Sequence, residues 1–116
     1  MGSFENKKGQ ESLDAFRTRV CAVLKEKGLE DPEAHQLLMD WTLAHEARVE
    51  ATGTSRAAIE FNIERGTLYI EAGFLGEGID TLESALIQAE QEDQKDLQEE
   101  IVKKINSYLE NQNFTI

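Results

Sequence analysis

The chain has 116 residues, 40% of them hydrophobic, and its 12 basic and 23 acidic side chains give a formal net charge of −11. This length suits one domain, and no apolar run reaches the about 18 residues that a membrane span requires. Because nucleic-acid binders attract phosphate groups with Lys and Arg, such a negative surface argues against DNA and RNA and favours a basic protein partner.

The first two predicted helices have clear end signals. Helical periodicity begins at Ser12, which can cap a first helix that Gly28 ends. Asp31-Pro32-Glu33 marks the start of a second helix, which stops near Thr52-Gly53. We expect the polar residues 1–11 to form a disordered N-terminal segment.

Three more helices are predicted, at about residues 56–72, 76–91 and 94–110. Gly73 separates the first of these from the second by a very short turn. We therefore predict an all-α fold of about five antiparallel helices, with a single domain over residues 12–110. The tail at residues 111–116 is expected to be flexible.

Small residues occupy helical positions on both sides of the turn at Gly73. A glycine inside a helix costs about 1 kcal/mol relative to alanine. Gly66 and Gly78 are therefore tolerated only where close packing recovers that free energy. A short turn brings the two helices that it joins close together, so the sequence predicts tight packing of their backbones.

The segment at about residues 59–92 resembles a tetratricopeptide repeat, a helix-turn-helix unit with small and bulky residues at fixed spacings. The matching positions are Gly66, Tyr69, Gly73, Gly78, Leu82 and Ala85. Gly78 replaces the usual alanine, Asn62 and Arg65 stand where Trp and Leu are common, and no proline closes the unit. The resemblance implies a short superhelix or helix-turn-helix bundle, in which flanking helices cap the single repeat. The alternative is an unrelated antiparallel bundle whose glycines ease helix crossings.

Members of this family line a concave groove with the first helix of each pair, and the groove accepts an extended peptide or a partner helix. By resemblance, the groove residues here are Glu60, Ile63, Glu64, Thr67, Ile70, Glu71, Leu97, Ile101 and Ile105. Acidic and isoleucine side chains in alternation suit a ligand with apolar anchors and flanking Lys or Arg. The same pattern fits isoleucines in a core and glutamates on a solvated face, because the periodicity is identical.

Residue arrangements that carry catalysis are sparse in this sequence. His35 and His45 lie about 15 Å apart on one predicted helix, too far to share a metal ion. No Ser-His-Asp arrangement, phosphate loop or Cys-x-x-Cys motif was found. We therefore predict no enzyme activity, no cofactor and no metal site. The segment around His35 is faintly similar to histidine phosphotransfer domains, but Leu38 and Met39 stand where those domains carry Lys and Gly.

We expect a non-enzymatic adaptor that binds a basic or amphipathic segment of another protein, with no part for nucleic acid or membrane. The alternative is a small acidic chaperone or antitoxin that masks one partner. Self-association as a homodimer, through Trp41 or the terminal apolar residues, is a further possibility. The sequence shows no secretory leader, so we expect a cytoplasmic protein.

Overall fold

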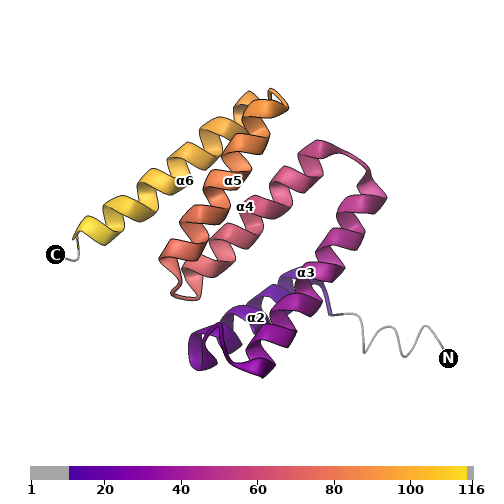
Figure 1. Cartoon of the computed structure of the whole chain (residues 1–116), viewed down its shortest axis with the longest axis vertical. Helices are drawn as coiled ribbons and strands as arrows, with labels where there is room; N and C mark the ends of the chain where they lie inside the picture. Colours follow the sequence, from indigo (N-terminus) through magenta and orange to yellow (C-terminus); the bar gives the residue numbers. More distant parts are fainter. Residues whose placement is uncertain (1–10, 115–116) are drawn as a thin grey trace. The chain divides into compact units, whose positions relative to one another are not determined.

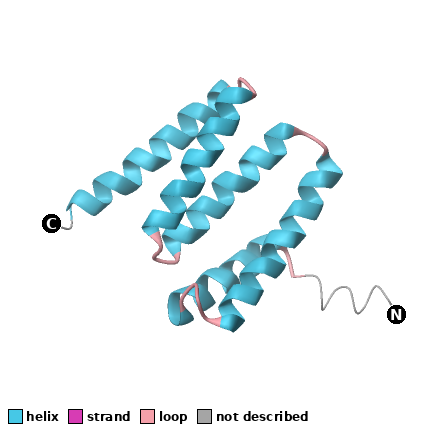
Figure 2. Ribbon diagram, in the orientation of Figure 1, coloured by secondary structure: helices cyan, strands magenta, loops and turns pink. Residues whose placement is uncertain are grey.

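The computed structural model describes residues 11–114, which form five helices and no strand (Figures 1 and 2). The helices are α2 (Leu13–Lys27), α3 (Pro32–Thr52), α4 (Ser55–Glu71), α5 (Leu75–Gln91) and α6 (Lys95–Phe114). The predicted all-α fold is therefore confirmed. Helix α6 extends to Phe114, beyond the end expected at Glu110, and so takes in part of the expected tail. Apart from Glu11, the segment expected to be disordered lies outside the described residues.

The chain divides into two compact units, an N-terminal unit of residues 1–48 and a C-terminal unit of residues 49–116. The sequence predicted one domain over residues 12–110. Helix α3 is continuous across the boundary between the two units, and the single domain stays a prediction.

In the N-terminal unit, the predicted capping residues define both helices. The Ser12 side chain accepts a hydrogen bond from the Ala15 backbone N–H at 3.0 Å, and Gly28 ends α2 with a φ of 93°. The Asp31 carboxylate accepts the Ala34 N–H at 3.0 Å at the start of α3. The buried apolar residues of this unit are Val20, Leu24, Ala34, Leu38 and Trp41.

In the C-terminal unit, α4, α5 and α6 surround one apolar core. The core consists of Ile59, Ile63, Leu82, Ala85, Ala89, Leu97 and Ile101, with Ile70, Leu86, Ile105 and Tyr108 packed against it and partly buried. Helix α5 runs antiparallel to both neighbours, and α4 and α6 therefore run in the same direction (Figure 1).

The two turns of this unit have the same backbone hydrogen bonds, twenty residues apart. In the first turn, Phe74 N–H donates to the Tyr69 carbonyl oxygen at 2.8 Å; in the second, Gln94 N–H donates to that of Ala89 at 2.8 Å. This bond across five residues belongs to the Schellman motif, which needs a residue in the left-handed region. Gly73 supplies that residue in the first turn, with a φ of 101°, and Asp93 supplies it in the second, with a φ of 57°.

Close packing between α4 and α5 depends on Gly66 and Gly78. A Cβ atom on Gly66 would lie 2.9 Å from the Leu82 Cγ atom, and one on Gly78 would lie 2.7 Å from the Gly66 carbonyl oxygen. Both distances are too short for real carbon atoms, so neither position has room for a side chain. The predicted close approach of the two backbones is confirmed.

Candidate functional site

Four of the nine predicted groove residues belong to the interior of the C-terminal unit. They are Ile63, Thr67, Leu97 and Ile101, all of which are buried. Three of them are members of the apolar core, and the Thr67 hydroxyl donates to the Glu64 carbonyl oxygen at 2.8 Å. Burial places these four side chains in the interior, and for Ile63 and Ile101 core packing is the alternative that the sequence left open.

The other five predicted residues retain exposed surface. Ile70 and Ile105 are half-buried and pack against the core, whereas Glu60 and Glu71 are exposed and Glu64 is half-buried. The three glutamates are spaced by four and seven residues, so they follow one face of α4. This acidic stripe is part of the predicted surface, but the isoleucines that were expected to alternate with it point largely inward.

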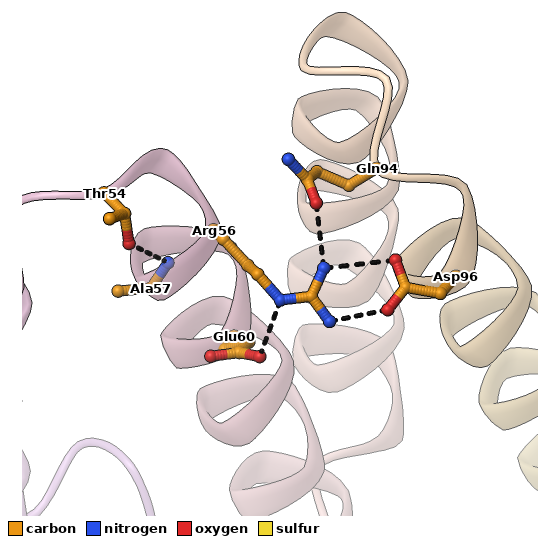
Figure 3. Close-up of polar contacts among 6 residues, drawn as sticks. All are labelled: Thr54, Arg56, Ala57, Glu60, Gln94 and Asp96. Carbon is orange, nitrogen blue, oxygen red and sulfur yellow. Dashed lines mark hydrogen bonds and ion pairs between the residues drawn. The ribbon is translucent and has the colours of Figure 1, made fainter.

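An arginine at the start of α4 connects this helix to the start of α6 (Figure 3). The Arg56 guanidinium donates to both carboxylate oxygens of Asp96, at 3.1 and 2.6 Å, and to the Gln94 side chain at 2.8 Å. It also lies 3.3 Å from the Glu60 carboxylate. The hydrogen bonds that Arg56 donates to Asp96 lower the pKa of the Asp96 carboxyl and raise the pKa of the Arg56 guanidinium. Glu60 thus belongs to the acidic stripe and also forms an ion pair with Arg56.

Asn62 and Arg65, which depart from the tetratricopeptide pattern, form a polar connection between α4 and α5. The Asn62 side-chain amide donates to the Gln88 side-chain oxygen at 2.5 Å, and Arg65 donates to the Asn62 oxygen at 3.2 Å. These two positions therefore carry side-chain hydrogen bonds, one between the helices and one within α4.

A cleft that the sequence did not predict lies between α5 and α6. It has a volume of about 410 Å³ and is lined by Leu86, Glu90, Gln98, Glu99, Val102 and Lys103. Val102 is 42% exposed although it is a large apolar residue, and Leu109, seven residues further along α6, is also 42% exposed. We call Val102 and Leu109 the α6 strip.

The α6 strip extends the apolar face of α6 sideways. The core face of this helix carries Leu97, Ile101 and Tyr108. Val102 and Leu109 each follow a core residue by one position, which moves them about 100° around the helix. The apolar arc of α6 is therefore wider than the part that α4 and α5 cover.

Negative charge is concentrated in the unit that carries the cleft. Residues 49–116 hold 14 of the 23 acidic and 5 of the 12 basic side chains, a net charge of −9. Two exposed carboxylates, Glu90 and Glu99, line the cleft, and Lys103 is its basic side chain. Gln98 donates to the Ala89 carbonyl oxygen at 3.3 Å and so joins the two helices at this end.

The histidine singled out for phosphotransfer is exposed in the first turn of α3, and its backbone N–H donates to the Asp31 carbonyl oxygen at 2.8 Å. Within residues 11–114, no group of three or more His, Cys, Asp or Glu side chains is placed to hold a metal ion. None of the described helices combines the length and the apolar character needed to cross a membrane.

Comparisons with protein-family models, with curated proteins and with solved structures found no match. From the start of α4 at Ser55 to the start of α6 at Lys95 the chain advances 40 residues, against 34 in a tetratricopeptide repeat. The helix-turn-helix unit of this chain is therefore six residues longer than that repeat.

Proposed function

We propose that this chain is a non-enzymatic protein-protein interaction module, a tetratricopeptide-like adaptor whose C-terminal unit binds a basic or amphipathic segment of a partner protein. The observation that carries this proposal is the exposed α6 strip, whose Val102 lines a cleft that two carboxylates, Glu90 and Glu99, also line.

Apolar exposure supplies the first support. Covering exposed apolar surface with a partner stabilises the complex by about 25 cal/mol for each Å² removed from water. Val102 and Leu109 would each contribute about 1 kcal/mol to a complex that covered them. Leu86, half-buried in the same cleft, extends the surface that a partner would contact.

Charge supplies the second support and indicates the chemistry of the partner. A net charge of −9 on one small unit attracts basic segments and repels acidic ones. Such attraction speeds association and selects partners, and added salt weakens it. We therefore expect a partner segment with apolar side chains on one face and Lys or Arg beside them.

The architecture supports the tetratricopeptide-like part of the proposal. Gly66 and Gly78 bring two helices into backbone contact, as the repeat requires, and the turn that follows α5 repeats the turn that follows α4. A unit that adds one antiparallel helix at each turn leaves its last helix partly uncovered. The α6 strip lies on that last described helix.

The test is quantitative affinity purification from the organism that encodes the chain, followed by mass spectrometry. Three baits are compared: the natural chain, Glu90→Lys with Glu99→Lys, and Glu30→Lys with Glu46→Lys. The last variant changes the total charge equally, but on exposed positions of the N-terminal unit. It therefore separates the local effect of the cleft from the effect of net charge.

We expect the natural chain and the N-terminal control variant to recover the same protein, in amounts that fall as the salt concentration rises. The Glu90→Lys, Glu99→Lys variant should lose it. Equal recovery by all three baits, or a recovered protein whose contacting segment is acidic, would count against the proposed function.

A further inference from the structure

Building on the proposed function, we propose that the cleft between α5 and α6 takes up a single α-helix of the partner, and that this helix runs antiparallel to α6 with Lys or Arg in its C-terminal turn. The bound helix would occupy the place where the C-terminal unit would add its next helix.

The repeated turn geometry indicates where a further helix would pack. Helices α4, α5 and α6 begin twenty residues apart, at Ser55, Leu75 and Lys95, and the same hydrogen bonds reverse the chain between them. Each step lays one helix antiparallel to the previous one (Figure 1). A further step of the same kind would lay a helix against α6, where Val102 is exposed beside Leu86 of α5.

The spacing of the apolar residues suits a helix better than an extended peptide. Val102 and Leu109 are seven residues apart, which is about 10.5 Å along α6. A partner helix presents apolar side chains on one face at intervals of three, four and seven residues, and so matches this distance in two turns. Val102 and Leu86 line the cleft in which such a ridge would pack, and Leu109 continues the exposed apolar surface along α6.

Charge along the cleft gives the bound helix a direction. Glu90 lies in the last turn of α5 and Glu99 in the first two turns of α6, so both carboxylates lie at the end where these helices are joined. Leu109 lies near the other end of α6. Basic residues are favoured in the last turn of a helix by its dipole. A helix with that common arrangement places its basic turn beside Glu90 and Glu99 only if it runs antiparallel to α6.

Charge also selects a basic partner in preference to a second copy of this chain. A second copy would bring another unit with a net charge of −9 against the first. Like charges across an interface oppose association, whereas a basic helix gains from the same field. Lys103 is the basic side chain that lines the cleft. Its replacement by an acidic residue should therefore tighten the binding of a basic ligand.

The experiment uses two synthetic amphipathic helical peptides with one composition and one leucine ridge. The first carries three arginines in its last turn, and the second carries them in its first turn; each has a nitroxide spin label at its C-terminus. Binding is measured by fluorescence anisotropy, and the position of the label is mapped from the broadening of amide signals in NMR spectra of the full chain.

We expect the first peptide to bind at least about threefold more tightly than the second, a difference typical of exposed charges. Its label should broaden the signals of residues 92–98 more than those of residues 106–110. Stronger broadening near Leu109 would overturn the direction, and tighter binding of the second peptide would overturn the placement of the basic turn.

Variants at exposed positions test the cleft itself. Val102→Asp should weaken the first peptide at least about tenfold, as loss of a central contact does. Ile87→Asp is the matched control, because Ile87 is 54% exposed on α5 and does not line the cleft; it should leave binding unchanged. Lys103→Glu should tighten binding and Glu99→Lys should weaken it.

The outcomes separate this inference from the proposed function. If Val102→Asp leaves peptide binding unchanged and the label broadens signals of α4 alone, the cleft is not the binding site. The chain would still be a binding module, so the proposed function would stand. A dimer of the natural chain in sedimentation experiments that Val102→Asp dissociates would assign the cleft to a second copy. If neither peptide binds and affinity purification recovers no basic partner, both ideas fail together.

Discussion

Gly66 and Gly78 face each other across the α4–α5 interface, and a Cβ atom on Gly66 would lie 3.1 Å from the Gly78 carbonyl oxygen. Neither glycine has a positive φ, so both are required for space and not for backbone conformation. The helix pair can approach this closely only because both side chains are absent. The two positions therefore determine how closely α4 packs against α5.

Gly78→Ala should destabilise the chain by about 1–3 kcal/mol, because the added methyl group meets the Gly66 carbonyl oxygen and the Ile70 side chain. Gly76→Ala is the control in the same helix. No atom lies within 4 Å of a Cβ there, and the change should stabilise the chain by about 0.4–1 kcal/mol. Urea unfolding measures both; a Gly78→Ala variant as stable as the natural chain would refute close packing.

Ile63→Asp should unfold the C-terminal unit, with a loss of about 3–5 kcal/mol, because Ile63 is 6% exposed and belongs to the core. The same replacement at the exposed Ile87 should change stability by less than about 0.5 kcal/mol. Circular dichroism melts of the two variants make the comparison. An Ile63→Asp chain that stays folded would return this residue to the groove that the sequence predicted.

Asp93→Gly should stabilise the chain by about 0.5–1 kcal/mol. Asp93 has a φ of 57° at the end of α5, where Gly73 serves the equivalent turn after α4. The change also removes an ion pair with Lys95, but both partners are largely exposed and such pairs contribute little. Glu92→Gly, at a residue with a φ of −97°, should destabilise instead. Thermal melts in which Glu92→Gly is more stable than Asp93→Gly would contradict this interpretation of the turn.

The ion pair between Arg56 and Asp96 should make the free energy of unfolding depend on pH in the acidic range. Arg56 lowers the pKa of Asp96 in the folded chain, so the folded state takes up the proton less readily than the unfolded state. The contribution of this pair is therefore fully present above the ordinary pKa of an aspartate, and it is lost as the pH falls through the lowered value.

Replacement of Arg56 by Gln should raise the pKa of Asp96 toward its ordinary value and remove this part of the pH dependence. NMR titration of the side-chain carboxyl carbons measures the pKa directly. Glu11 is an internal control, because Arg19 and not Arg56 lowers its pKa. An Asp96 pKa that is the same with and without Arg56 would show that the ion pair does not persist in solution.

Much of the fold could be predicted from the sequence because the helix ends have local signals. Ser12, Gly28, Asp31 and Gly73 each end or begin a helix where predicted. The second turn has no such signal, because an aspartate occupies the position where glycine is usual. The end of α6 was also placed too early, because its polar last residues resemble a frayed tail.

The surface was harder to predict than the fold. Ile63 and Ile101 have the spacing of groove residues, but core residues repeat at the same period. Which side of a helix its neighbours cover depends on long-range packing, and no local pattern specifies that. Val102 was missed for a related reason, since one apolar residue beside a core stripe is recognised as exposed only once α5 and α6 have been placed.

The most direct test of the proposed binding function is affinity purification with the natural chain, Val102→Asp and Ile87→Asp as parallel baits. We expect one protein with a basic amphipathic segment to be recovered in equal amounts by the natural chain and Ile87→Asp, and to be lost from Val102→Asp. Recovery of the same proteins in the same amounts by all three baits would contradict the account.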